Sequence, residues 1–471
     1  MKKIILYCFV LLSTLGLGQI NYSRQNINLI SLSTPNFGVG GTDGRLYSGC
    51  WGWYQQSKNK EYAICGASNG TYFMDISNPA TPTVCAYVLG KLGCTWREMK
   101  TYQNFCYIIS DDPTPNKFQI IDMQYLPDSV HIVHNGTSYF EHAHTLWIDK
   151  DKMYVGSVTY SNAAFSPMNV YSLATPSAPV LMRELSADIQ PPLINAVHDM
   201  YTRNDTIYAS CGFEGLYILK YNTSTNTFSQ LGSYSGYANS AYNHSSWLTQ
   251  NGKYLIFCDE VPVGRPIHFV DVQNLGNIQP LQTFKPFPGT TPHNPYLIGN
   301  DHAIVSCYQD GLYIYNISQP GAASVCGYFD THHQGGANVG NYFGADYRGN
   351  WGAYPYLPSK IIIAQDMQNG VFLLDATAAF SPGAGIQNNS LSTGEVMVYP
   401  NPAAGSLSVK CRFTEPSLLS IENVLGEIVY QKNFETGIDE IIETNRFNSG
   451  TYVLSVTSNR TTINKKIVIY N

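Results

Sequence analysis

The stretch PHNPYLIGNDHAIVSCYQD at residues 292–310 continues as GLYIYNIS at 311–318 and SVCGYFDT at 324–331. It reads as an inner strand, a turn with Asn and Asp, a second strand, a third strand opened by Gly, and a short fourth strand. The same layout occurs at residues 197–235 and at residues 50–90. A repeated unit of several strands predicts blades of sheet stacked around one axis rather than independent domains.

One aromatic or histidine position recurs at the start of seven such units. Its members are Trp51, Trp96, His144, His198, His244, His293 and Trp351. They follow one another at intervals of roughly 45–60 residues, which is the period expected of a β-propeller. Because the first strand of each blade lines the channel, we expect these side chains to meet around the channel mouth.

The last unit, WGAYPYLPSKIIIAQDMQNGVFLLD, stops at Asp375 after three strands, whereas residues 28–34 resemble the fourth strands elsewhere. We therefore expect the N-terminal segment to complete the seventh blade and close the ring, which removes open sheet edges. The predicted fold is all-β: a seven-bladed β-propeller at residues 19–375, closed by an N-terminal strand, followed by a linker at 376–394 and a small C-terminal β-sandwich at 395–471.

The third strand of each unit ends on a residue that can stabilise the following turn. Asp, Ser and Asn side chains can bond the backbone two residues further on, so we expect a structural role for this position. Its members are Asp75, Asp122, Ser172, Lys220, Asp271, Asn316 and Asp375, of which Lys220 breaks the pattern.

Composition limits the classes of function. Among 471 residues, charged residues make up 13% and aromatic residues 13%, and the net charge is −6 without a basic stripe. Nucleic acid is therefore not an expected partner. Residues 1–18 contain two lysines and an apolar run and predict a secretory signal peptide, after whose removal no segment has the length of a membrane span.

Residues 395–471 carry a specific resemblance. The segments VYPNPAAGSLSVK, NVLGEIVYQ, FNSGTYVLSV and KKIVIYN resemble the type A C-terminal sorting domain of the type IX secretion system of Bacteroidetes. The resemblance implies that the secretion machinery handles the chain through residues 395–471. It also implies that the mature protein is attached to the cell surface, on the exterior of the outer membrane, or is released as a secreted extracellular protein.

The propeller also resembles a family. CWGW, EYAICGASNGTYFMDISNPATP, TWREMK, NAVHDM, NHSSWLT with its later CDE, and WGAYPY are similar to the choice-of-anchor B proteins, which carry LVIVD-type repeats. Unit three departs from the repeat, since NVYSLATPSAP lacks its aspartate. The resemblance implies fold and location and supplies no catalytic residue.

Cysteine use allows two interpretations in an oxidising compartment. Cys65, Cys211, Cys258 and Cys307 occupy equivalent strand positions and are expected to be buried free thiols. Cys50 and Cys94 lie beside the recurring tryptophan in adjacent units and form the candidate disulfide.

The recurring position can be read in three ways. Its histidines, His144, His198, His244 and His293, are candidate ligands of a transition metal, with Glu98, Glu141, Asp199 and His142 nearby in sequence. Alternatively, the position is structural, and the His and Trp side chains pack as flat rings on the next blade. Trp occupies the same position in three units and cannot ligate a metal, which favours this interpretation. The third reading is a mouth that binds a surface protein, a glycan or a small ligand.

No common hydrolase, nucleotide-binding or zincin motif occurs, so no catalytic residue is assigned. The sequence favours a binding or interaction protein. The alternatives are a metal- or histidine-dependent hydrolase or lyase with its site at the channel mouth, and a structural surface-layer component.

Overall fold

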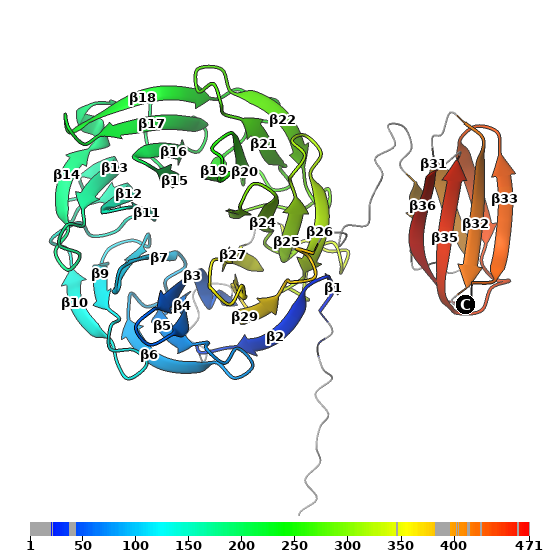
Figure 1. Cartoon of the computed structure of the whole chain (residues 1–471), viewed down its shortest axis with the longest axis horizontal. Coiled ribbons are helices and arrows are strands. Elements are labelled where there is room, and N and C mark those ends of the chain that lie inside the picture. The colour runs from blue at the N-terminus through cyan, green and yellow to red at the C-terminus, as the bar shows by residue number, and fades with distance from the viewer. Residues whose placement is uncertain are drawn as a thin grey trace, which may run out of the picture. The chain divides into compact units, whose positions relative to one another are not determined.

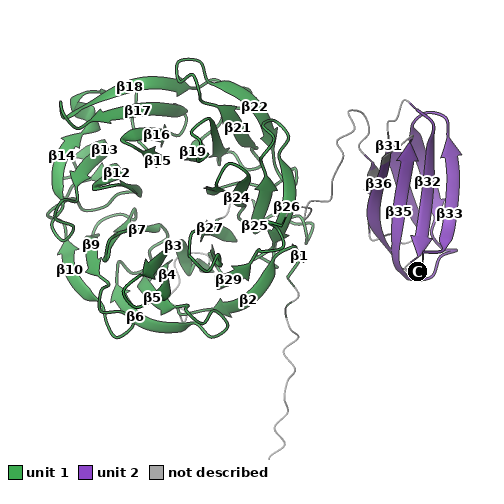
Figure 2. Cartoon of the chain, viewed as in Figure 1, with its two compact units in different colours: residues 1–384 green, residues 385–471 purple. Residues whose placement is uncertain are grey.

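The computed structural model describes two compact units, within residues 1–384 and 385–471 (Figure 2). The described residues are 20, 22–36, 44–344, 347–381, 396–401, 403, 405–411, 415–423, 426–458 and 461–470. The predicted signal peptide and residues 382–394 of the predicted linker lie outside them.

Seven antiparallel sheets form the first unit, and consecutive strands pair in chain order within the first five blades. The first blade contains β3 (Tyr47–Gln55), β4 (Lys60–Ala67), β5 (Gly70–Asp75) and β6 (Thr83–Leu89). The second contains β7 (Arg97–Tyr102), β8 (Phe105–Ser110), β9 (Phe118–Asp122) and β10 (His131–Gly136). The third contains β11 (Thr145–Asp149), β12 (Lys152–Thr159), β13 (Phe165–Ser172) and β14 (Val180–Glu184), followed by the 3-10 turn η2 (Leu185–Ala187).

The remaining blades continue the same order. The fourth contains β15 (Asp199–Arg203), β16 (Thr206–Ser210), β17 (Leu216–Asn222) and β18 (Thr227–Tyr234). The fifth contains β19 (Asn243–Leu248), β20 (Tyr254–Asp259), β21 (Ile267–Asp271) and β22 (Gln279–Phe284). The sixth contains β23 (Pro295–Ile298), β24 (His302–Ser306), β25 (Leu312–Asn316) and β26 (Ser324–Phe329). The seventh contains β27 (Asn350–Tyr354), β28 (Ile362–Asp366) and β29 (Gly370–Asp375) from the end of the propeller and β2 (Asn28–Ser33) from its start.

The blades form a closed ring with their first strands toward the centre and their fourth strands at the rim (Figure 1). The core is divided into apolar clusters between consecutive blades. Between blades one and two, for example, Tyr62, Ile64 and Phe73 pack with Met99 and Ile108, and all five are at most 1% exposed. Two-sided burial explains why the second and third strands are almost continuously apolar. The predicted seven-bladed propeller is confirmed.

The N-terminal strand closes the ring as predicted. β2 pairs antiparallel with β29, with Asn28 opposite Asp375 and Ser33 opposite Val371. One further contact was not predicted: β1 (Arg24–Gln25) adds a fifth strand to blade six, with Arg24 opposite Phe329. Between β1 and β2, Ile27 is 1% exposed in the core shared by blades six and seven, so the N-terminal segment joins two blades.

The residues that end the third strands stabilise the following turns, as predicted. In six blades the side chain accepts a hydrogen bond from the backbone N–H two residues further on, at 2.8–3.2 Å. The acceptors are Asp75, Asp122, Ser172, Asp271, Asn316 and Asp375. Lys220 instead donates to the backbone oxygen of Asn204.

The segment after Asp375 differs from its predicted role as a linker. Ala376 and Ala379 are each 1% exposed in the cluster between blades six and seven, and Phe380 contacts the His302 ring. Small residues are common in linkers, but they also pack closely against a folded domain. Composition alone therefore could not show that residues 376–381 pack on the propeller.

The second unit is a β-sandwich of two sheets. One contains β30 (Met397–Tyr399), β31 (Ser406–Cys411) and β34 (Ile438–Glu443). The other contains β32 (Ser417–Asn423), β33 (Ile428–Phe434), β35 (Gly450–Ser458) and β36 (Thr461–Ile469). Alternate residues of β31, such as Leu407 and Val409, are fully buried between the sheets, as expected of strands with one solvent face.

The turn before β29, the strand that pairs with the N-terminal strand β2, requires a glycine. Gly370 has a φ of +113°, and a Cβ there would lie 2.4 Å from the backbone oxygen of Ser33 in β2. We expect Gly370→Ala to lower the free energy of unfolding by about 1–3 kcal/mol, because it adds both backbone strain and a clash with the closing strand. Chemical denaturation measures this loss.

Gly93→Ala is the matched control. Gly93 also has a positive φ, +69°, but a Cβ there meets no atom within 4 Å. Gly93→Ala therefore measures the strain of a left-handed backbone without a clash, which costs about 1 kcal/mol. A loss at Gly370 no larger than that at Gly93 would contradict the close approach of β2.

Candidate functional site

Six of the seven recurring residues meet at one end of the central channel, where they line one cavity: Trp96, His144, His198, His244, His293 and Trp351. Their rings contact one another in blade order. The centroids of His144 and His198 are 4.1 Å apart, those of His198 and His244 4.5 Å, and those of His244 and His293 4.2 Å. His293 contacts Trp351 at 4.2 Å, and Trp351 stacks on Trp96 at 5.1 Å. We call these six residues the channel ring and its four histidines the histidine arc.

The second strand of each blade fixes the backbone of the arc. The N–H of His198 donates to the oxygen of Ser210 at 2.8 Å, and that of His293 donates to Ser306 at 2.8 Å. Each histidine therefore sits at the start of a first strand whose register is already set by its neighbour in the blade. Its side chain faces the channel because of this register.

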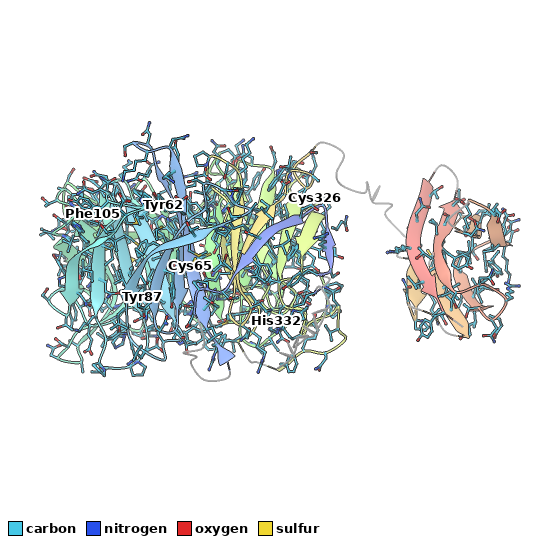
Figure 3. The ribbon with its side chains drawn as sticks, turned by 90° about the horizontal axis from the view of Figure 1, so that it is seen from below. Tyr62, Cys65, Tyr87, Phe105, Cys326 and His332 are labelled. Atoms are coloured by element: carbon cyan, nitrogen blue, oxygen red, sulfur yellow. The ribbon has the colours of Figure 1, made fainter. Side chains whose placement is uncertain are left out.

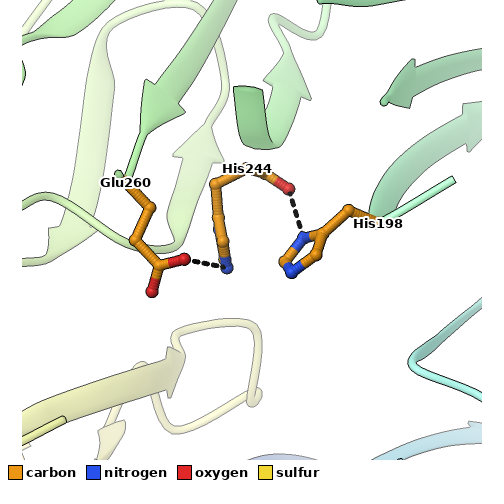
Figure 4. Close-up of side chains that lie close together, drawn as sticks. All are labelled: His198, His244 and Glu260. Atoms are coloured by element: carbon orange, nitrogen blue, oxygen red, sulfur yellow. Dashed lines mark hydrogen bonds and ion pairs between the residues drawn. The ribbon is translucent and has the colours of Figure 1, made fainter. Parts of the chain in front are cut away.

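Three imidazoles are oriented by the backbone of the next blade. Nδ1 of His198 lies 3.2 Å from the oxygen of His244 (Figure 4). Nδ1 of His244 lies 3.1 Å from the oxygen of His293. Nδ1 of His293 lies 2.5 Å from the oxygen of Trp351. A carbonyl oxygen can only accept, so Nδ1 carries the proton in each ring and the lone pair of the neutral imidazole is on Nε2.

Burial keeps two of these rings uncharged. It lowers the pKa of both His198 and His293 well below the usual value, and the neighbouring imidazoles lower it further. His198 and His293 are therefore neutral near pH 7 and present Nε2 as an acceptor or ligand atom.

The fourth histidine of the arc is oriented by a carboxylate. Nδ1 of His144 lies 2.6 Å from Asp111, and Nδ1 of His142 lies 3.3 Å from the other oxygen of the same group. Burial raises the pKa of Asp111, but the hydrogen bonds from the two histidines outweigh it and lower the pKa to about 2. Burial by itself lowers the pKa of His144. The hydrogen bond to Asp111 and its negative charge outweigh burial, so the pKa of His144 is raised above its usual value.

A buried carboxylate and a tyrosine complete this end of the channel. Glu260 is 6% exposed, and its Oε2 lies 3.8 Å from Nε2 of His244. The hydroxyl of Tyr308 donates to Oε1 of Glu260 at 2.5 Å, while the Tyr308 ring packs 4.5 Å from that of His293. Glu260 and Tyr308 come from the loops after the second strands of blades five and six.

The backbone of Tyr308 is unusual for an aromatic residue. Its φ is +44°, and the equivalent position in blade four, which makes the same bridge to the following blade, is Gly212 with a φ of +60°. A bulky side chain in this conformation costs about 1–2 kcal/mol and is uncommon outside special sites. The Tyr308 side chain is therefore held against Glu260 at the expense of local stability.

The remaining recurring residue, Trp51, is not in the ring, which corrects the prediction. It packs on Tyr354 at 4.7 Å and Trp147 at 6.5 Å, with Nζ of Lys100 4.4 Å above its ring. Trp147 and Tyr354 each come three residues after a ring member, about 10 Å further along the strand. Trp51 belongs to this deeper aromatic layer, because β3 extends further toward the mouth than the other first strands.

The deeper layer lines the channel with aromatic side chains around a second small cavity of about 30 Å³. Trp247 contacts Trp147 at 4.9 Å, Tyr201 at 5.0 Å, Tyr296 at 5.4 Å and Tyr356 at 5.4 Å. Sequence reasoning missed this layer. Its signal is an aromatic residue three positions after each of His144, His198, His244, His293 and Trp351.

The acidic residues singled out in the sequence separate in the structure. Glu98 and Asp199 line the same cavity as the arc, and Glu98 pairs with Lys100. Burial raises the pKa of Glu98 although Lys100 opposes this shift. Glu141 instead accepts a hydrogen bond from the backbone of Asn116 at 3.2 Å, and it does not line this cavity.

The cavity at the channel ring is small, with a volume of about 20 Å³. One water molecule needs about 10–15 Å³ measured in this way. The space therefore fits an ion or one to two water-sized groups, and a whole sugar ring or peptide could only rest at its opening.

The cysteines correct one prediction and support another. No disulfide joins Cys50 and Cys94, which are both buried free thiols. Cys50 packs in the cluster between blades seven and one, whereas Cys94 lies in the loop that leads into blade two. Cys65, Cys211, Cys258 and Cys307 are buried and free, as expected; Cys65, which is labelled in Figure 3, is fully buried.

The sequence did not single out Asp111, Glu260 or Tyr308. Asp111 directly follows Ser110, the last residue of β8, and Glu260 directly follows Asp259, the last residue of β20. An acidic residue immediately after the second strand was the available signal. Its partners lie in other blades or loops, so only the assembled ring shows the contact.

Two solved structures match most of the chain. A protein from Lactobacillus plantarum matches with a TM-score of 0.47 and 12% identity, covering 84% of this chain and 98% of that protein. The N-terminal domain of Nup159 matches with a TM-score of 0.45 and 8% identity, covering 76% of this chain and 96% of that domain.

Among curated proteins, an endo-acting ulvan lyase of Formosa agariphila is 25% identical over 85 residues. The match covers 18% of this chain and 16% of the length of that enzyme. So short a match describes a shared segment and carries no activity over to this chain.

Residues 397–470 match the family described as the secretion system C-terminal sorting domain. They include every strand of the β-sandwich. Within the described part of the chain, no helix is long and apolar enough to cross a membrane. The chain therefore carries a sorting domain of the type IX secretion system, which implies export to the cell surface or secretion.

Proposed function

We propose that the protein is an exported, cell-surface or secreted propeller of the choice-of-anchor B type that binds a ligand at the histidine-lined end of its channel. The observation that carries this proposal is the common orientation of the histidine arc. All four Nδ1 atoms are occupied by a backbone oxygen or by Asp111, which leaves four Nε2 atoms for a ligand.

Packing alone does not account for this arrangement. His293 is fully buried, and its Nε2 has no hydrogen-bond partner. A buried polar atom without a partner costs about 1–3 kcal/mol. If the ring at position 293 served only to pack between blades, an apolar residue there would make the protein more stable. A ligand that bonds to Nε2 therefore explains the histidine better.

The size of the cavity limits which part of a ligand can contact the arc. Only an ion or the tip of a larger molecule, such as a protein side chain or one hydroxyl of a glycan, fits beside the arc. Glu260 and Tyr308 do not line this cavity, but Oε2 of Glu260 lies 3.8 Å from Nε2 of His244, and the Tyr308 hydroxyl donates to Oε1 of Glu260.

Binding that depends on the arc tests this function. Purified full-length protein and its His144→Ala, His198→Ala double variant are compared on a glycan array, on a displayed peptide library and by titration with small anions and cations. We expect at least one class to bind the wild type and to lose at least about 10-fold in affinity in the variant, since two hydrogen bonds of about 0.5–1.5 kcal/mol each are removed, or more where the ligand is charged.

His131→Ala is the control, because His131 is exposed at the rim and stacks on Tyr125. Binding that is equal in all three proteins, or absent from every panel, would contradict a binding site at the arc.

An enzyme at the same site is the second candidate. Glu98 and Asp199 line the cavity beside the arc, and a carboxylate next to imidazoles can act as a general acid or base in a hydrolase or lyase. Turnover of a polysaccharide, ester or peptide substrate that is lost in Glu98→Gln would favour it. Ligand binding without turnover favours the binding protein.

A further inference from the structure

We propose that the histidine-lined end of the channel holds one transition metal ion, bound by His198, His244 and Glu260 with His293 as the adjoining imidazole. This inference rests on the proposed function, since it names the ligand class of the same site. It also changes the carboxylate expected from the sequence, which set Glu98, Glu141 and Asp199 beside the four histidines, whereas the structure brings Glu260 to His198 and His244.

The three side chains are close enough to share an ion. One ligand atom from each of His198, His244 and Glu260 lies within 4.8 Å of the other two (Figure 4). Ligand atoms bound to one zinc ion at about 2.0–2.1 Å stand about 3.3 Å apart. Nε2 of His244 and Oε2 of Glu260 are already at 3.8 Å, so small side-chain rotations bring the set to bonding distance.

The surroundings of these ligands match those of known metal sites. A histidine that binds a metal through one nitrogen usually donates the other N–H to a carbonyl or carboxylate, which fixes the ring. His198 and His244 do so through the oxygens of His244 and His293, at 3.2 and 3.1 Å. The carboxylate is fixed as well, because the Tyr308 hydroxyl bonds Oε1 of Glu260 and leaves Oε2 toward His244.

An independent observation points to the same ion. Nε2 of His293 is buried without a partner, and its ring lies 4.2 Å from that of His244. Either a water molecule that donates to this lone pair or a cation beside His244 would satisfy it, and titration with zinc distinguishes the two. His144 is set apart at the other end of the arc, where Asp111 holds it.

The chemistry of the set selects the kind of metal. Imidazoles with one carboxylate suit Zn²⁺, Ni²⁺, Cu²⁺ or Fe²⁺, whereas Ca²⁺ and Mg²⁺ prefer oxygen ligands alone. The cavity of about 20 Å³ is lined by His198, His244 and His293 but not by Glu260, whose Oε2 lies 3.8 Å from Nε2 of His244. It accommodates an ion with one bound water and no larger organic group. We therefore commit to a late first-row divalent ion, with zinc as the probe.

Calorimetric titration with Zn²⁺ alone, on full-length protein stripped with a chelator, tests the proposal. We expect one equivalent to bind, and we expect His198→Ala and Glu260→Gln each to weaken binding by about 100-fold or more. Tyr308→Phe, which only positions Glu260, should weaken it about 10-fold. His131→Ala, at the rim, should leave it unchanged.

Substituted cobalt provides a second readout. The visible absorption of Co²⁺ reports nitrogen and oxygen ligands directly, and it should shift in Tyr308→Phe and disappear in Glu260→Gln. Circular dichroism and unfolding curves of each variant verify the fold. Glu260→Gln keeps the side-chain shape, so it tests the site even if His198→Ala does not fold.

Absence of zinc binding, or binding that all variants retain, would overturn the metal site. The outcome for the proposed function is separate: arc-dependent binding of a glycan, peptide or anion without any metal would reject the ion and leave the binding function standing. If neither zinc nor any other ligand binds at the arc, the metal site and the proposed function are both rejected.

Discussion

Deleting residues 26–34 is expected to lower the free energy of unfolding of the propeller by about 5 kcal/mol or more. The deletion removes the buried Ile27, and loss of a core isoleucine side chain alone costs about 2–5 kcal/mol. It also removes all pairing between β2 and β29 and leaves β29 as an open edge. Thermal unfolding should show a midpoint lower by roughly 5–10 °C, and size-exclusion chromatography should show new aggregates.

Leu32→Ser in the same strand is the control for this deletion. Leu32 is 37% exposed, and its backbone pairing with Phe372 does not depend on the side chain. Its unfolding free energy should stay within about 0.5 kcal/mol of the wild type. A synthetic peptide of residues 26–34 added to the deleted protein should restore part of the loss. An unchanged melting temperature after deletion would show that β2 does not close the ring.

Replacing Trp247 by alanine is expected to cost about 3 kcal/mol of stability, which is the lower end of the range for a buried tryptophan. Trp247 lies at the centre of the deeper aromatic layer and packs against the cores on both sides of blade five. Its loss removes contacts with Trp147, Tyr201, Tyr296 and Tyr356 at once. Urea unfolding followed by circular dichroism measures the effect.

Phe213→Ala provides the comparison, because Phe213 is 73% exposed and its ring contacts only Tyr242 among the aromatic pairs. Removing an exposed aromatic side chain should change stability by no more than about 0.5 kcal/mol. Similar losses for the two variants would mean that the aromatic layer does not support the ring.

The fold was predictable because repetition amplifies a weak local signal. One blade shows only short alternating strands, but seven copies with the same turn residues define both the strand order and the ring. The missing fourth strand after Asp375 identified residues 28–34 as its replacement, and the pairing of β2 with β29 confirms it. The two residues of β1 were not predicted, because so short a strand has no pattern of its own.

The candidate site was predictable only in part. The spacing placed His144, His198, His244 and His293 at equivalent positions, and the structure brings their rings into contact. The same spacing misplaced Trp51, since counting residues between units cannot detect that β3 begins earlier than the other first strands. A shift of three residues along a strand moves a side chain about 10 Å, from the ring to the deeper layer.

The sequence by itself determined the seven blades, their closure, the turns after the third strands and the position of the histidines, because each depends on local periodicity or on a position that recurs in every unit. Only the tertiary structure decided how those histidines act. Their Nδ1 atoms bond to carbonyl oxygens of the next blade, and Glu260 and Tyr308 reach the arc from loops of different blades. These contacts join residues 46–49 positions apart in the sequence. Which atoms meet across neighbouring blades depends on how the ring closes, and no pattern within a single blade reveals it.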